Sequence, residues 1–306
     1  MKRANETTRK APGADGLTDA DGLAPANLRL LAEASLAEDR AQDDITTSAL
    51  IPPDQMGRAT IIAKSEGILA GMSVAEATFA AVDASPVWRG EKEDGDRVSP
   101  GDVFATVEGL LNAILRAERV ALNFLAHLSG VASATATVVA QLKGTNCHLR
   151  DTRKTTPGLR SLDKYAVRTG GGTNHRLDLS DGVLIKDNHL AALRARGLDI
   201  PDAVRLARKA NAAVRIEIEV TSVAEARLAM AAGADELLLD NMSLRDMRDV
   251  VRMAAKRDPR PVLEASGGIT LASARAVAET GVDYISMGAI THSAPALDMS
   301  LEVEAG

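Results

Sequence analysis

The second half of the chain alternates short apolar segments with helical segments, and this pattern limits the possible folds more than any other feature. Strand–helix alternation is typical of a parallel sheet covered by helices. If such a sheet closes into a barrel, functional residues lie at the carboxyl ends of its strands. The segments that we expect to be strands are Cys147–Arg150, Gly182–Ile185, Val214–Val220, Glu236–Leu239, Pro261–Ala265 and Tyr284–Met287.

The helices between the later strands carry recognisable start and stop signals. Ser222 and Glu225 have the spacing of a capping box, and Ser243 and Thr270 stand where two further helices should begin. Gly281 stands where the last of these helices should end. These signals support an α/β barrel in the second half of the chain.

The first half has a different pattern. Gly57–Lys64 and Gly67–Ala70 suggest a strand pair that bends at Ser65 and Glu66, and Ser73–Val82 suggests a helix. Two long helical patterns follow, over Leu110–Leu128 and Val131–Leu142. We therefore expect an α/β domain up to about Ser129, followed by the barrel. The expected parts are a flexible tail (1–22), the N-terminal α/β domain (23–129), the barrel (130–290) and a final segment (291–306) that returns to the N-terminal domain.

Composition narrows the class of protein. The net charge of −6 gives no general attraction to nucleic acid, and aromatic residues at 2% are too few for a base-stacking surface. A single cysteine, Cys147, excludes an intrachain disulfide and is expected to be a small core residue. No apolar run is expected to span a bilayer, and the polar start of the chain lacks a secretory signal. These features predict a cytoplasmic protein that binds neither nucleic acid nor membrane.

Four cationic side chains crowd the segment Arg150–Arg160, directly after an expected strand. A charge run is most often a solvated surface loop. Here a Pro-Gly turn follows, and the buried strand before it would hold Arg153 and Lys154 at its carboxyl end. We therefore expect these two residues in a functional site.

Two more groups of cations follow. Three glycines precede His175 and Arg176, and Lys186 ends the expected strand Gly182–Ile185. An arginine fork matches two carboxylate oxygens, so these residues suit an acidic substrate. A flexible connector and a snorkelling lysine are the alternatives.

Carboxylates end the next strands. Glu217 and Glu219 alternate with apolar residues and should point into the barrel, and Asp240 ends the strand that begins at Glu236. A buried carboxylate needs a cation, a metal or hydroxyl groups as a partner. Hard oxygen ligands suit Mg²⁺, which makes Glu219 and Asp240 candidate ligands, direct or indirect.

A phosphate site is expected after the last strands. Ser266, Gly267 and Gly268 separate a strand from a helix, so their backbone N–H groups can bind a phosphate. Gly288, after the next strand, could supply the other side of the site.

Together these segments resemble the quinolinate phosphoribosyltransferase family. The resemblance extends from about Leu28 to the end of the chain. One departure is an aspartate in Asp43-Asp44-Ile45-Thr46-Thr47 where the family motif usually has glycine. The segments that carry the resemblance are Glu118–Leu125, Leu128–Gly130, Asp151–Arg160, Lys164–Val167, Gly170–Arg176, Leu184–His189, Leu239–Met242, Glu264–Ile269 and Asp283–Ser293.

The resemblance implies an N-terminal α/β sandwich joined to an incomplete α/β barrel. It also implies a homodimer with shared active sites, Mg²⁺ as cofactor, and transfer of phosphoribose to quinolinate with loss of CO2. Lys154, Lys186, Glu219 and Asp240 would be the catalytic residues. The residues implied to bind the substrates are Arg119 (in the neighbouring subunit's site), Arg153, His175, Arg176, Lys186, Ser266, Gly267, Gly268 and Gly288.

Three alternatives stay open from sequence. One is a molybdenum-transport-associated protein of the same fold with another acceptor. Another is a nicotinate phosphoribosyltransferase that does not decarboxylate. The third is a non-catalytic protein that binds pyridine carboxylates. The number of cations favours a diacid substrate.

Overall fold

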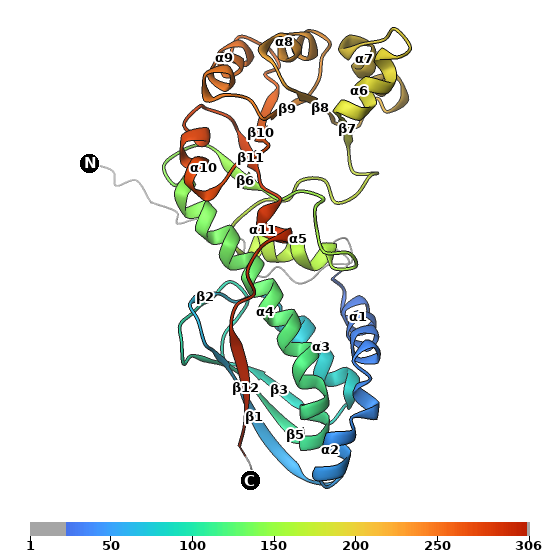
Figure 1. Ribbon diagram of the computed structural model, residues 1–306, viewed down its shortest axis with the longest axis vertical. Helices are drawn as coiled ribbons and strands as arrows, with labels where there is room; N and C mark the ends of the chain where they lie inside the picture. The colour runs from blue at the N-terminus through green and yellow to red at the C-terminus, as the bar shows by residue number, and fades with distance from the viewer. Residues whose placement is uncertain (1–22, 305–306) are drawn as a thin grey trace, which may run out of the picture. The chain divides into compact units, whose positions relative to one another are not determined.

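The structure, a computed structural model, describes residues 23–304 and divides them into two compact units (Figure 1). The expected tail, residues 1–22, lies outside the described residues. Residues 161–171 belong to the first unit, which the sequence pattern does not indicate. The N-terminal unit comprises residues 23–134, 161–171 and 294–304, and the barrel unit comprises 135–160 and 172–293.

The N-terminal unit is built on a four-stranded antiparallel sheet of order β12-β1-β5-β3. β1 (Met56–Ala63) lies between β5 (Val103–Leu110) and the C-terminal strand β12 (Met299–Glu304), and β3 (Val87–Gly90) pairs with β5. The final segment of the chain thus forms an edge strand of this sheet.

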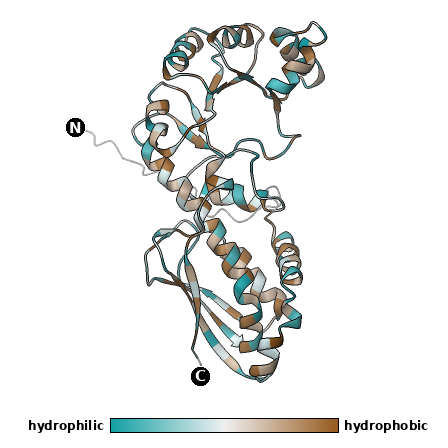
Figure 2. Ribbon diagram, viewed as in Figure 1, coloured by the Kyte–Doolittle hydropathy of each residue, from teal (hydrophilic) through white to brown (hydrophobic). Residues whose placement is uncertain are grey.

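One face of this sheet is buried beneath helices. Along β1 the residues Ala59, Ile61 and Ala63 are buried, while their neighbours are partly exposed, as expected when one face packs on a core. The helices α3 (Met72–Val82) and α4 (Leu111–Leu142) supply the other side of the same core. Figure 2 shows both hydrophobic and hydrophilic residues on α4, as this one-sided burial requires.

The expected pairing of the first two strands is wrong. β2 (Gly67–Ile68) pairs with β4 (Arg97–Val98) and not with β1. The reason is that β12 and β5 already occupy both edges of β1, so that no backbone hydrogen-bonding edge is left for β2.

Four short helical elements complete the N-terminal unit. Asp44, within the segment that departs from the family motif, caps α2 by accepting hydrogen bonds from the backbone N–H groups of Thr46 and Thr47, both at 3.0 Å. The elements are α1 (Pro25–Glu38), the 3-10 turn η2 (Ala41–Asp43), α2 (Ile45–Leu50) and α5 (Arg160–Thr169).

The two long helices expected around Ser129 and Gly130 are one continuous helix, α4. Ser129 does not end the helix, because its hydroxyl bonds to the backbone N–H and C=O of Ala70. Gly130 serves close packing: a Cβ atom there would lie 2.2 Å from the carbonyl oxygen of Pro295. The small residues Ser129 and Gly130 thus mark a close approach of another backbone segment to α4, and not the helix boundary that the sequence pattern suggested.

Because it is continuous, α4 is long and apolar enough to cross a membrane by length and composition alone, contrary to the expectation from sequence. Its most apolar stretch is 56% buried inside the structure. The buried residues include Ala117, Ala121 and Leu125, which belong to the core of the N-terminal unit. This burial is that of a core helix.

The barrel unit contains a parallel sheet of six strands in the order β6-β11-β10-β9-β8-β7. No ladder joins β6 to β7 among residues 23–304, so the barrel is incomplete. All six strands were predicted within three residues of their ends. They are β6 (His148–Arg150), β7 (Val183–Ile185), β8 (Ile216–Val220), β9 (Glu236–Asp240), β10 (Val262–Ser266) and β11 (Tyr284–Ser286).

The helices of the barrel unit begin where the sequence signals placed them. Ser222, Ser243 and Thr270 each accept a hydrogen bond from a backbone N–H of the first turn. The helices are α6 (Asp187–Arg194), α7 (Ile200–Ala210), α8 (Val223–Ala231), α9 (Leu244–Ala254), α10 (Leu271–Ala278) and the short α11 (Ala289–His292).

Replacing Gly130 by alanine tests the packing explanation for the unbroken helix. In an unobstructed helix this change stabilises the protein by up to about 1 kcal/mol. Here the added Cβ would meet the Pro295 backbone, so we expect a destabilisation of about 1–3 kcal/mol in urea unfolding.

The control is Gln141→Ala at an exposed position of α4, which should leave the unfolding midpoint almost unchanged. A Gly130→Ala variant as stable as the wild type would contradict the packing explanation.

Candidate functional site

A cavity of about 320 Å³ opens in the barrel unit at the carboxyl ends of the strands. Ser266 and Ser286 end β10 and β11, and Asp240 ends β9. The structure brings eight of the residues predicted for the site together in the lining of this one cavity: Arg153, Lys154, His175, Arg176, Lys186, Glu219, Asp240 and Ser266.

Cations form one side of the cavity. The Nε atom of Arg153 is buried and has no hydrogen-bond acceptor among residues 23–304. Burial and the neighbouring charge of Arg153 lower the pKa of Arg176, whose guanidinium donates to the carbonyl of Gly182. Lys186 stands at the start of α6, immediately after β7. A bound anion would relieve the repulsion between the two guanidinium groups.

Carboxylates lie elsewhere in the lining. Burial, followed by the negative charges of Asp240 and Asp187, raises the pKa of Glu219. This shift indicates that the carboxylates are close enough to repel one another. A set of hard oxygen donors with uncompensated negative charge fits Mg²⁺.

The loop that carries Lys154 is held at its backbone. The N–H of Lys154 donates to the Thr152 hydroxyl at 3.0 Å, and its carbonyl accepts from the Thr291 hydroxyl at 2.7 Å. Gly288 lies against the same residue, since a Cβ at that position would be 3.0 Å from Cδ of Lys154. The loop after β6 and the loop after β11 are therefore packed together.

The small-residue loop after β10 is shaped by the loop after β9. Gly267 and Gly268 both have positive φ, and Asn241 is in the left-handed region with a φ of 52°. Asn241 donates its backbone N–H to the carbonyl of Ser266, and its side-chain Nδ2 donates to Asp240 at 2.7 Å. A Cβ on Gly267 would lie 2.4 Å from the Asn241 side chain. Glycine is therefore required at position 267 by both conformation and space.

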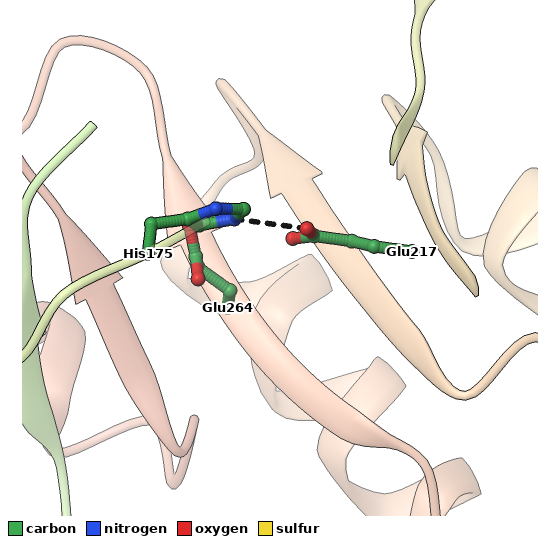
Figure 3. Close-up of side chains that lie close together, drawn as sticks. All are labelled: His175, Glu217 and Glu264. Atoms are coloured by element: carbon green, nitrogen blue, oxygen red, sulfur yellow. Dashed lines mark ion pairs between the residues drawn. The ribbon is translucent and has the colours of Figure 1, made fainter. Parts of the chain in front are cut away.

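Sequence reasoning missed a buried cluster beneath the cavity, which Figure 3 shows. The Nε2 atom of His175 lies 2.9 Å from Glu217 Oε2 and 3.7 Å from Glu264 Oε1. Burial and the charge of Glu217 raise the pKa of Glu264 to about 7. Glu217 points into the barrel as expected, but neither it nor Glu264 was assigned to the site.

The cluster continues into the barrel through Arg150. Its Nη1 atom lies 2.6 Å from Glu264 Oε2 and also contacts Glu236, and its guanidinium stacks 3.3 Å from the centre of the Tyr284 ring. The signal available in the sequence was the odd placement of Glu217, Glu236 and Glu264 within strands that are otherwise apolar.

Three ligand atoms of His175, Glu217 and Glu264 lie within 4.8 Å of one another, a grouping that could hold a metal ion. The imidazole argues against it. Its Nδ1 faces the backbone N–H of Arg176 at 2.7 Å and so accepts a hydrogen bond. A neutral ring with Nδ1 as acceptor carries its proton on Nε2, which then has no lone pair for a metal.

One predicted residue lies in the other unit. Arg119 is on α4, where its side chain is 65% exposed and its guanidinium lies 3.6 Å from the carboxylate of Glu118. It is not in the lining of the cavity.

Comparison with known protein families gives two domain matches that together cover most of the chain. The family described as quinolinate phosphoribosyl transferase matches in two domains, the N-terminal domain over residues 44–129 and the C-terminal domain over residues 131–302.

Two similar curated proteins and one solved structure cover most of the chain. A probable nicotinate-nucleotide pyrophosphorylase [carboxylating] of Bacillus subtilis is 44% identical over 268 residues, 87% of this chain and 90% of that protein. The human nicotinate-nucleotide pyrophosphorylase [carboxylating] is 39% identical over 93% of this chain and 96% of that protein. Among solved structures, NadC from Streptococcus pyogenes superposes with a TM-score of 0.86 at 39% identity, covering 92% of this chain and 98% of that one.

Cys147, which the sequence predicts to be a small core residue, is buried. Burial, then the charges of Asp283 and Glu264, raise its pKa to about 12. The reactive thiolate is therefore scarce at neutral pH and appears only as pH approaches 12. We expect iodoacetamide at pH 8 to leave the native thiol unmodified and to label it fully in urea. Stoichiometric labelling of the native protein would show that the thiol is accessible and ionised.

Proposed function

The chain belongs to the quinolinate phosphoribosyltransferase family, and we propose that it transfers phosphoribose from phosphoribosyl pyrophosphate to quinolinate in the cavity of the barrel unit. The products are nicotinate mononucleotide, pyrophosphate and CO2, as in the synthesis of NAD. The observation that carries this assignment is one cavity lined by cations suited to a diacid, by carboxylates suited to Mg²⁺, and by Ser266, the residue directly before the two glycines of the loop suited to a phosphate.

Arg153, Arg176 and Lys186 bind the two carboxylates of quinolinate. An arginine fork can bind both oxygens of one carboxylate, and the buried Nε of Arg153 has a donor to offer. Arg176, whose pKa is lowered by burial and by the charge of Arg153, gains from a ligand with two negative charges that gives both guanidinium groups a partner. His175 lines the same cavity, as the resemblance implies, and its ring lies against Glu217 and the backbone N–H of Arg176.

Arg119 completes the site of a neighbouring subunit in a homodimer, as the resemblance implies. Its exposed guanidinium on α4 can reach a second molecule, since its ionic contact with Glu118, at 3.6 Å, is a weak one. The acidic net charge of the chain gives no general attraction to nucleic acid, and we propose a cytoplasmic protein without a nucleic-acid partner.

Glu219 and Asp240 hold Mg²⁺ or the ribose hydroxyls, and Lys154 faces the pyrophosphate. When bound, Mg²⁺ stabilises negative charge on the pyrophosphate. The backbone N–H groups of Ser266, Gly267 and Gly268, at the start of α10, bind the 5-phosphate together with Gly288. The packing of Gly288 on Lys154 brings these two anion-binding groups together.

The chemistry needs position and charge more than a strong base. The pyridine nitrogen attacks the anomeric carbon while the bond to pyrophosphate breaks, and the carboxylates stabilise the positive charge that develops on the ribose. The ring nitrogen is then cationic. When the 2-carboxylate leaves as CO2, its bonding electron pair stays at C2 beside this cation, and a proton then takes its place. Lys154 and Lys186 stabilise the leaving groups and the negative charge near the ring.

The direct test mixes the protein with quinolinate, phosphoribosyl pyrophosphate and Mg²⁺, with nicotinate as a parallel acceptor. We expect equal amounts of nicotinate mononucleotide and CO2 from quinolinate and no product from nicotinate. Ligand-induced stabilisation without product would instead mean a non-catalytic binding protein, and product from another acceptor would mean a related transferase.

Arg153→Ala tests the assignment of the diacid site. Removing a charged hydrogen-bond donor costs about 1.5–3 kcal/mol, so we expect kcat/KM for quinolinate to fall about 10- to 150-fold while the protein stays folded. The matched control is Arg252→Ala on α9, whose partner Asp249 lies on the same helix and whose side chain is largely exposed. Wild-type turnover by Arg153→Ala would remove this residue from the site.

A further inference from the structure

His175 is held by the protein through both nitrogens of its ring. Nε2 lies 2.9 Å from Glu217 Oε2 on β8, and Nδ1 lies 2.7 Å from the backbone nitrogen of Arg176 (Figure 3 shows the contact with Glu217). A neutral imidazole has one donor and one acceptor. The acceptor of the ring, Nδ1, is occupied by the Arg176 N–H, and Nε2 lies within ion-pair distance of Glu217.

The two contacts depend on each other. The backbone N–H of Arg176 can only donate, so Nδ1 must accept and the ring proton must be on Nε2. The Glu217 carboxylate lies 2.9 Å from Nε2, and its negative charge favours the proton at that nitrogen, so Glu217 selects the tautomer of the ring. Without Glu217 the ring could rotate or take up the other tautomer, and the Arg176 N–H would lose its acceptor.

The surrounding structure fixes the backbone at this point. The His175 N–H donates to Asp151 Oδ1 at 2.9 Å, and the Asn174 side chain donates to Asp151 Oδ2 at 2.6 Å. The loop is thus attached to the end of β6 up to His175. The next residue, Arg176, brings a guanidinium to the cavity, and the ring of His175 is what holds its backbone nitrogen.

We propose that Glu217 and His175 act as one positioning unit that sets the backbone of Arg176. Glu217 selects the ring tautomer, the ring accepts the Arg176 N–H, and Arg176 binds the carboxylate. This inference rests on the proposed function for the role of Arg176, but the state of the ring is independent of it.

The carboxylate of buried Glu264 also favours this tautomer of His175. Arg150 holds its Oε2 at 2.6 Å, which leaves Oε1 facing His175 at 3.7 Å. A second carboxylate on this side of the ring makes it more favourable to keep the N–H at Nε2. Both glutamates thus favour the tautomer that the Arg176 backbone requires.

A double-mutant cycle tests the unit. We expect His175→Ala and Glu217→Ala each to reduce kcat/KM for quinolinate by at least about tenfold, and the double variant to lose no more than about threefold beyond the worse single variant. If His175 contacted the substrate independently, the two losses would multiply, and the proposal would be wrong.

Conservative variants of Glu217 and His175 test whether these residues act by positioning Arg176 or by their charge. Glu217→Gln keeps an oxygen that accepts the Nε2 proton, and His175→Asn keeps an acceptor near the place of Nδ1. Both should recover most of the activity lost in the alanine variants, within about fivefold of wild type for Glu217→Gln. The control is Glu236→Gln, a buried glutamate on the next strand that contacts Arg150 and Arg215. Combined with His175→Ala, its effect should be multiplicative.

A measurement that needs no turnover reads the tautomer directly. In ¹⁵N-edited NMR at pH 8.5, the His175 signal, identified by its loss in His175→Ala, should show a proton on Nε2 and none on Nδ1. A proton on Nδ1 would overturn the proposal even in an active enzyme. The expected tautomer in a protein that makes no nicotinate mononucleotide would refute the proposed function and leave this positioning unit in place.

Discussion

The buried ionic network around Arg150 is the interaction on which the barrel unit depends. Arg150 ends the edge strand β6, and its guanidinium reaches the carboxylates of Glu236 on β9 and Glu264 on β10 while it stacks on Tyr284 of β11. Buried carboxylates without a cation would be strongly destabilising. Arg150 neutralises part of this charge and leaves Glu264 directed at His175. The positive charge of Arg150 therefore stabilises the barrel interior and also holds Glu264, which lines the cavity.

The parallel sheet brings residues that are far apart in the sequence close together. In a parallel sheet every carboxyl end lies at the same edge, so Glu219, Asp240, Ser266 and Ser286 meet although they are spread over the second half of the chain. The loops are then coupled by direct contacts. Asn241 links the carboxylate of Asp240 to the glycine loop, because its side chain lies where a Cβ of Gly267 would be.

The parts of the structure that sequence could predict are those governed by local rules. Apolar runs bounded by Ser222, Ser243 and Gly281 are enough to locate the strands and helices of the barrel unit. Close approach of distant backbone is not visible in this way, and so Gly130 was read as a break in α4 when its role is to accommodate Pro295. The buried partners of His175 were missed because a glutamate within an apolar strand signals only that it needs a partner, and the partner of Glu264 is far away in the sequence.

The separation of charge within the cavity explains why a diacid fits better than a monoacid. Burial and the nearby charge of Arg153 lower the pKa of Arg176, and the Nε atom of Arg153 is buried without an acceptor in the described chain. A diacid gives each cation a partner. A monoacid leaves one desolvated guanidinium unpaired, and the cost of that group opposes binding. The site therefore discriminates between the two acids because a monoacid leaves part of its positive charge without a partner. This discrimination requires both arginines to be held in place before the substrate binds.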